Sequence, residues 1–201
     1  MSTAIPLTPE VLVSAYTHGI FPMDVGGQVE WFSPDPRAIL PLNAFRVSKN
    51  LARRCRSRRF EIRLNTCFEQ VIRACGDREE GTWISNEIVT AYLRLHELGL
   101  AHSVETWQDG ELTGGLYGVA LRGAFFGESM FHRRTDASKV ALVALVEQLR
   151  NRGFTLLDVQ FTTPHLEQFG IVEIPRQEYL DRLAAALDVD AQFVDPAAPP
   201  P

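Results

Sequence analysis

Hydrophobic positions near the start of the chain follow a helical period. Thr8 followed by Pro9 is typical of a helix start and Gly19 of a helix stop, so a short N-terminal helix is expected. Prolines and glycines among aromatic residues between 20 and 37 predict an ordered, irregular connection with a short strand around Trp31. The connection is therefore expected to join two lobes.

Helical and strand patterns alternate in the next segment. Residues 48–56 read as a basic helix capped by a serine, and apolar and polar positions alternate over 60–64 as in a half-buried strand. Thr66 and Glu69 match the capping box that begins many helices. A further helix is predicted over 85–99, with apolar residues at helical spacing and a terminal glycine.

Beyond residue 100 the period of the pattern changes to two, which favours strands. Hairpin-type turns at 109–110 and 122–123 separate three alternating segments, so an antiparallel meander is expected. A long amphipathic helix is predicted to begin at Asp136 or Ser138, followed by an apolar strand over 154–161. A short helix that starts at 163–164 and a last helix over 175–187 complete the predicted elements.

This order of elements predicts an α+β fold with the layout of the GNAT-like acyltransferase core. We expect a small N-terminal lobe and connecting loop at 1–36, a GNAT-like catalytic domain at 37–188 and a disordered tail at 189–201. Acetyl-CoA-dependent members of that fold carry a glycine-rich turn before the long helix, because main-chain amides there wrap a pyrophosphate. The turn at 132–137 contains no glycine, which disfavours acetyl-CoA.

Composition places the chain among ordinary globular proteins, with 45% hydrophobic and 22% charged residues. No apolar run has the length of a membrane helix and no signal-peptide pattern is present, so a cytoplasmic protein is expected. Three cysteines without C-x-x-C spacing are expected to be reduced thiols. The histidines match no metal motif, so no metal site is predicted.

Charge is distributed very unevenly along the chain. The overall formal charge is -5, but residues 46–63 carry +7 and the remainder carries -12. Nearly all of these cations are arginines, whose planar side chain binds phosphate bidentately and stacks on bases. The segment around Arg53, Arg54 and Arg56 therefore predicts contact with nucleic acid, and the alternative is a solvated helix face.

Two acids interrupt apolar strands, where an unpaired charge is unfavourable. Asp158 and Gln160 point the same way along one predicted strand, and Glu128 interrupts another. Both acids could pair with core arginines, or they could line a pocket for a cationic substrate. A serine hydrolase using Ser129, Asp158 and His165 is disfavoured, because G-E-S-M-F lacks the second glycine of a nucleophile elbow.

Longer motifs give the chain a specific resemblance. The strings are AYTHGIFPM, WFSPDPRAIL, EGTWI, AYLRLHELGLAHSVETW, GGLYGVA, FFGESMF, DASKVAL, LLDVQ, HLEQFG and EIPRQEYL. In this order they resemble the leucyl/phenylalanyl-tRNA–protein transferases over nearly the whole globular chain. The resemblance implies a cytoplasmic bacterial enzyme that moves leucine or phenylalanine from charged tRNA onto the N-terminal arginine or lysine of a protein, which marks it for N-end-rule degradation.

The same resemblance assigns roles to individual residues. It implies that Asp158 and Gln160 are catalytic and that Glu128 binds the acceptor. It also implies that Trp83 stacks on the terminal adenine of tRNA and that Tyr16, a further site position, binds tRNA. The leucyl or phenylalanyl side chain would lie in a pocket formed by Leu116, Phe125, Leu142, Leu145 and Leu157.

Two departures from the family pattern stand near the N-terminus. Met23 occupies a position where family members often carry tryptophan, and the stretch with a G-G-D-L motif that usually precedes the A-Y-x-x-G string is missing. We therefore expect a smaller N-terminal lobe and one fewer aromatic contact to the tRNA end.

The implied reaction needs no cofactor, because an aminoacyl ester is already activated and positioning of the amine can lower the barrier. We expect Asp158 to orient the attacking amine through Gln160 and to stabilise the cationic intermediate. Two other functions stay open: a non-catalytic module that binds tRNA ends through the basic helix and Trp83, and an acetyl-CoA-dependent N-acetyltransferase. Without the resemblance, Trp83 and the pocket leucines would equally fit ordinary core positions.

Overall fold

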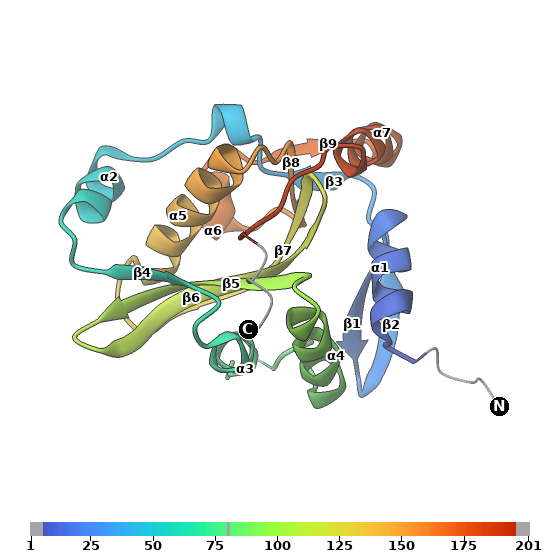
Figure 1. Cartoon of the computed structure of the whole chain (residues 1–201), viewed down its shortest axis with the longest axis horizontal. Coiled ribbons are helices and arrows are strands. Elements are labelled where there is room, and N and C mark those ends of the chain that lie inside the picture. The colour runs from blue at the N-terminus through green and yellow to red at the C-terminus, as the bar shows by residue number, and fades with distance from the viewer. Residues whose placement is uncertain (1–5, 80, 196–201) are drawn as a thin grey trace, which may run out of the picture.

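A seven-stranded mixed sheet forms the centre of the molecule in the computed structural model, which describes residues 6–79 and 81–195 (Figure 1). The strands follow the order β4, β5, β6, β7, β8, β3, β9, and all neighbours are antiparallel except β7 and β8. Their bounds are β4 Glu61–Leu64, β5 Ala101–Gln108, β6 Glu111–Leu121, β7 Ala124–His132, β8 Leu156–Gln160, β3 Arg37–Ile39 and β9 Val172–Ile174.

The predicted meander, long helix and returning strand are confirmed. β5, β6 and β7 are joined by short turns, α5 (Ala137–Asn151) then crosses one face of the sheet, and β8 returns parallel to β7. The opposite face is covered by α3 (Phe68–Gly76) and α4 (Asn86–Glu97), so each face has its own hydrophobic cluster. The α+β class with the GNAT-like layout is therefore observed.

The N-terminal segment is more regular than predicted. Helix α1 (Pro9–Thr17) begins at Thr8 as expected, but the segment after it forms a hairpin of β1 (Phe21–Val25) and β2 (Gln28–Phe32) in place of an irregular connection. Gly26 and Gly27 both have positive φ, which allows the two-residue turn that lets the strands pair.

Two of the remaining helices begin at the predicted serines, and the long helix α5 begins after Asp136, one of its two predicted starts. Ser48 caps α2 (Lys49–Arg56) and Ser85 caps α4. The capping box is wrong, because the main-chain N–H and hydroxyl of Thr66 both donate to the buried carboxylate of Glu105 and α3 begins at Phe68. The elements that complete the chain are η1 (Leu42–Ala44), α6 (Pro164–Glu167) and α7 (Arg176–Leu187).

The segment after α7 also differs from the prediction of a disordered tail. Residues 189–195 return to the sheet, where the Phe193 ring is 2% exposed and lies 5.3 Å from the Phe125 ring and 4.6 Å from that of His102. A single large apolar side chain thus anchors a segment whose average composition is typical of disorder. The end of the predicted tail, 196–201, lies outside the described residues.

Within the part of the chain that the structure describes, no helix has the length and hydrophobicity required to cross a membrane.

Candidate active site

The site lies where two parallel strands separate. β7 and β8 pair only through residues 124–126 and 156–158, and beyond this point they diverge. Gln160 ends β8 with a positive φ of 60°, and the N–H of Phe161 donates to the carbonyl of Val159 at 2.7 Å, so the chain turns sharply. The divergence leaves a cavity of about 580 Å³.

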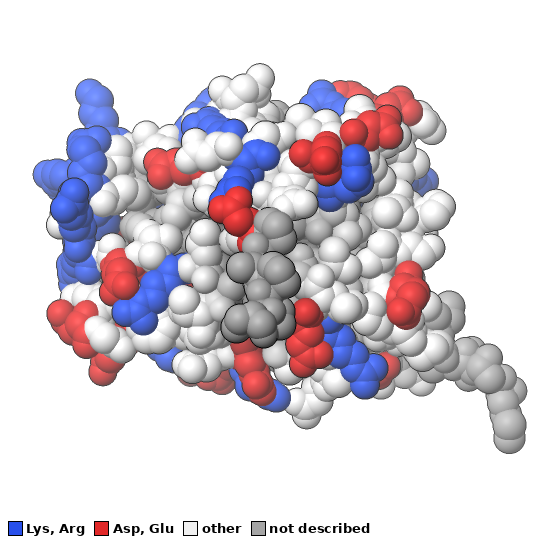
Figure 2. All heavy atoms as spheres, in the orientation of Figure 1, with Lys and Arg blue, Asp and Glu red and all other residues white. Residues whose placement is uncertain are grey.

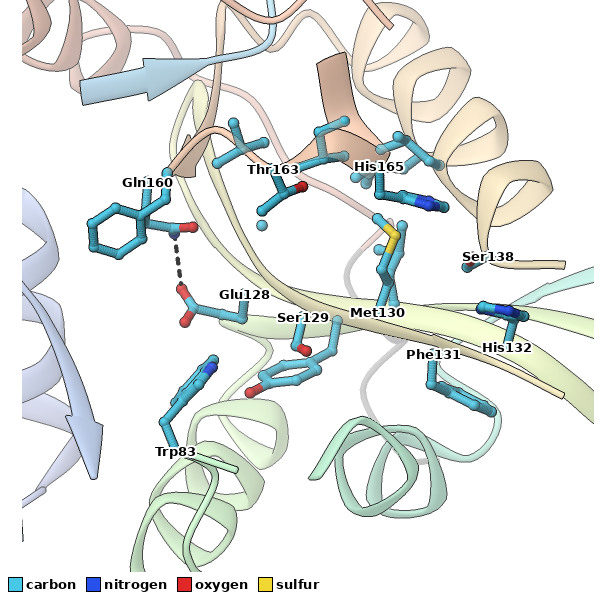
Figure 3. A pocket seen from close by; sticks show the side chains of 18 of the residues that line it. Trp83, Glu128, Ser129, Met130, Phe131, His132, Ser138, Gln160, Thr163 and His165 are labelled. Carbon is cyan, nitrogen blue, oxygen red and sulfur yellow. Dashed lines mark hydrogen bonds between the residues drawn. The ribbon is translucent and has the colours of Figure 1, made fainter. Parts of the chain in front are cut away.

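The cavity has two polar ends and an apolar middle. Figure 3 shows Trp83, Glu128 and Gln160 grouped at one end. His132, Ser138 and His165 surround the other end, beyond Met130. The apolar wall between the ends is formed by Leu116, Met130, Leu142, Leu145 and Leu157.

Local structure explains this apolar wall. Leu142 and Leu145 follow Ser138 at helical spacing and lie on the same face of α5, whereas Leu116 pairs with Met130 across β6 and β7. Four of the five predicted pocket residues therefore line the cavity. Phe125 does not line the cavity, because it lies where β7 and β8 are still paired and its ring is fully buried against Phe193, so its place in the aminoacyl pocket stays a prediction.

Among the described residues, neutral groups alone donate hydrogen bonds to Glu128. Its carboxylate accepts hydrogen bonds from the hydroxyl of Tyr16 at 2.7 Å and from that of Tyr92 at 3.4 Å. It also accepts one from the amide of Gln160 at 3.4 Å (Figure 3). Protein atoms surround the carboxylate, and this desolvation raises its pKa to about 8, although the tyrosine hydrogen bonds oppose the shift. The raised pKa favours the protonated form of Glu128.

Asp158 occupies a different environment and does not line the cavity. It is 0% exposed, and Arg37, 1% exposed, donates to it from Nε at 2.9 Å and from Nη2 at 2.6 Å. The hydroxyl of Tyr179 donates at 2.8 Å and the main-chain N–H of Gln160 at 2.9 Å. All acceptor sites of Asp158 face protein donors, so it has no free site for the amine, and its expected action through Gln160 stays a prediction. Asp158 thus holds the main chain of Gln160, whose side-chain amide faces Glu128.

The other predicted residues at this end divide into two groups. Trp83 and Met23 line the cavity, as a contact to the end of tRNA requires. Tyr16 is fully buried, and its hydroxyl contacts the hydroxyl of Tyr92 and donates to the carboxylate of Glu128. Tyr16 has no exposed surface, so the predicted contact of Tyr16 with tRNA stays a prediction that this structure does not support.

The basic segment forms an exposed cationic surface on α2. Positive side chains gather on this part of the molecule (Figure 2), and Arg53 and Arg56 are exposed. Arg54 is partly exposed and pairs at 3.4 Å with Asp136, which precedes α5. The basic surface thus reaches the helix whose first turn borders the cavity.

Sequence reasoning did not identify the partners that hold these carboxylates. Arg37, Tyr92 and Tyr179 come from β3, α4 and α7, and only the tertiary structure brings them to the site. One signal was available: Arg37 directly precedes the apolar run A-I-L, and a buried acid in a strand requires a cation. Among the described residues, no group of three His, Cys, Asp or Glu side chains could hold a metal ion.

Comparison with solved structures finds distant neighbours. L-PGS from Bacillus licheniformis is 13% identical with a TM-score of 0.43, covering 88% of this chain and 62% of that one. A GCN5-related N-acetyltransferase-like protein from Streptococcus suis is 14% identical with a TM-score of 0.40, covering 82% and 63%. The chain spans less than two thirds of either neighbour.

Sequence comparison gives much closer relatives. Residues 39–184 match the sequence profile of the leucyl/phenylalanyl-tRNA protein transferases, and residues 6–35 match that of their N-terminal domain. Proteins named leucyl/phenylalanyl-tRNA–protein transferase from Gloeobacter violaceus and Herpetosiphon aurantiacus are 59% and 57% identical, over 94% and 93% of this chain and 98% of each relative. The chain therefore belongs to the leucyl/phenylalanyl-tRNA protein transferase family.

Proposed function

We propose that the chain transfers leucine or phenylalanine from charged tRNA to the N-terminal arginine or lysine of a protein, which marks that protein for N-end-rule degradation. One observation carries the proposal: a single cavity joins an apolar compartment to a carboxyl group, a carboxamide and an indole ring. These are the surfaces required by an aminoacyl side chain, a cationic acceptor and a terminal base. The cytoplasm, where tRNA is charged, is the proposed location.

The donor would occupy the apolar middle of the cavity. Burial of a leucyl or phenylalanyl side chain against Leu116, Leu142 and Leu145 contributes about 1.5–3 kcal/mol. Trp83, at the adjoining end, would stack on the terminal adenine, which contributes about 1–3 kcal/mol per base. The α2 arginines would hold phosphates of the acceptor stem.

The acceptor side chain would bind at Glu128. A guanidinium or ammonium group near this carboxyl favours its ionised form, so acceptor binding would lower the pKa of Glu128 from about 8 and release its proton. The resulting ion pair lies in a desolvated site, where hydrogen bonds between charged groups are strong. Proteins whose first residue has no cationic side chain would leave Glu128 protonated and bind more weakly.

The chemical step itself needs little besides position. The neutral α-amine attacks the ester carbonyl carbon, the new C–N bond forms, the C–O bond to the ribose breaks, and one proton passes from the amine to the ribose oxygen. Fixed orientation can supply on the order of 7 kcal/mol. The Gln160 carboxamide, beside Glu128, would orient the amine, and Asp158 would act indirectly by holding the main chain of Gln160.

Transfer of radiolabelled leucine from charged tRNA to a peptide with N-terminal arginine tests the proposal directly. A matched peptide with N-terminal alanine is the control, and Glu128→Gln should raise the KM for the arginine peptide while leaving the KM for tRNA unchanged. Binding of tRNA without transfer would favour a non-catalytic module, and acetylation of the peptide from acetyl-CoA would favour an N-acetyltransferase.

A further inference from the structure

The end of the cavity opposite Glu128 contains polar groups that the proposed reaction does not use. The Oγ of Ser138 is buried and has no hydrogen-bond partner among the described residues, although Ser138, 1% exposed, lines the cavity. The Nε2 of His165 is likewise buried and unpartnered. Figure 3 shows both side chains at the same end of the cavity. Buried polar atoms are normally paired, so a missing partner indicates a ligand position.

Main-chain groups at the same place also lack partners. Ser138 and Lys139 stand in the first turn of α5, a helix of 15 residues whose N-cap, Asp136, makes no side-chain capping bond. The N–H groups of Ser138 and Lys139 donate to no acceptor among the described residues, whereas that of Ala137 donates to Arg134. Free N–H groups and the helix dipole make a helix start suitable for an anion.

The charges around this turn also favour an anion. Lys139 and His132 both lie close enough to His165 to lower its pKa, after the larger effect of burial. The carboxylate of Asp136 is the opposing charge, but it lies 3.4 Å from Arg54 and 3.8 Å from Lys139 and is balanced by them. The position is therefore electropositive and continuous with the basic surface of α2.

We propose that the first turn of α5, with Ser138 and His165, is a phosphate subsite that holds a phosphodiester of the donor's 3′-terminal C-C-A strand. The Ser138 hydroxyl and the N–H groups of Ser138 and Lys139 supply three donors to its oxygens. The subsite rests on the proposed function, because that function supplies the phosphodiester. It connects the basic surface of α2 to the aminoacyl compartment.

Two donors of different length test the subsite. Leucyl-adenosine carries no phosphate, whereas the leucylated trinucleotide C-C-A carries two phosphodiesters. Ser138→Ala should lower kcat/KM for the trinucleotide about ten-fold, as expected for a lost hydrogen bond to a charged group, and leave kcat/KM for leucyl-adenosine unchanged. Thr106→Val is the matched control, since it removes another buried, unpartnered hydroxyl that does not line the cavity. It should affect neither donor.

Inorganic phosphate provides a second readout. It should inhibit transfer from the trinucleotide competitively, inhibit transfer from leucyl-adenosine much less, and lose most of its inhibition in Ser138→Ala. Equal kcat/KM losses for both donors in that variant, or no loss, would overturn the subsite. Failure of the wild type to transfer leucine from either donor would overturn the proposed function instead.

Discussion

At the scale of single residues, the sheet holds one buried and one half-buried acid by different chemistry. Asp158 faces a buried guanidinium and two further donors, whereas Glu128 faces two tyrosine hydroxyls and a carboxamide. Only the first set carries a full positive charge. Arg37 neutralises Asp158 and not Glu128, so the carboxyl group of Glu128 in the cavity is free to pair with an incoming cation.

The pKa of Glu128 predicts a specific dependence of stability on pH. Its pKa is raised to about 8 in the folded protein from 4.5, so the folded state keeps a proton that the unfolded chain loses as pH rises. The stabilising effect is complete below about pH 4.5 and disappears as pH rises through about 8. Wild type should therefore lose stability relative to Glu128→Gln between these values. Urea unfolding of both proteins from pH 5 to 9 measures this, and parallel curves would contradict it.

The Arg37–Asp158 pair predicts a loss of stability rather than of chemistry alone. Asp158→Ala leaves a buried guanidinium without its partner, which should reduce the free energy of unfolding by roughly 3–5 kcal/mol. Arg37→Ala should act similarly, and the double variant should lose less than the sum of the two, as coupled residues do. Denaturant unfolding of the three variants checks the cycle. Strict additivity would show that the pair is not coupled.

At the scale of elements, α2 is a short helix whose contribution is electrostatic. Its single buried side chain, Leu51, fixes it to the molecule, while the arginines remain on its outer surface. Each phosphate contact releases counterions, so the α2 surface should make tRNA binding strongly dependent on salt.

Changing Arg53, Arg54 and Arg56 together to alanine should therefore reduce the slope of log affinity against log salt by about two to three, since each contact contributes ~0.7–0.9. Trp83→Ala is the matched comparison: it should weaken tRNA binding by about 1–3 kcal/mol and keep the slope, because stacking releases few ions. Affinity measured at several salt concentrations distinguishes the two. A wild-type slope in the triple variant would mean that α2 is only a solvated face.

At the scale of the whole molecule, residues 189–195 cover the hydrophobic core beside α5. Phe193 is 2% exposed and packs against Phe125 and Phe154. Residues 189–195 thus cover the edge of the cluster that includes the cavity wall.

Phe193→Ala should lower the free energy of unfolding by about 3 kcal/mol, the usual result of removing a buried aromatic ring. Transfer activity well below the melting temperature should change little, because Phe193 does not line the cavity. Thermal unfolding and leucine transfer measured on the same preparation test both statements. Val172→Ala, an exposed apolar position, is the control and should change neither.

Local sequence determined those features that depend on neighbours within a few residues. Serine caps predicted the starts of α2 and α4, the change of period at residue 100 predicted the meander, and an apolar run predicted the strand that carries Asp158 and Gln160. The family motifs then indicated which polar residues share a site. These signals are local or are carried by short strings, so a single sequence contains them.

Tertiary structure alone decided how each candidate residue is used. It paired Asp158 with Arg37, 121 positions away, buried Tyr16 beneath Glu128, and removed Phe125 from the cavity wall. A periodic pattern identifies the buried face of an element, but which distant donor satisfies a buried carboxylate depends on how elements pack. Desolvation and hydrogen bonding then set what each group can do, and both are properties of the assembled fold.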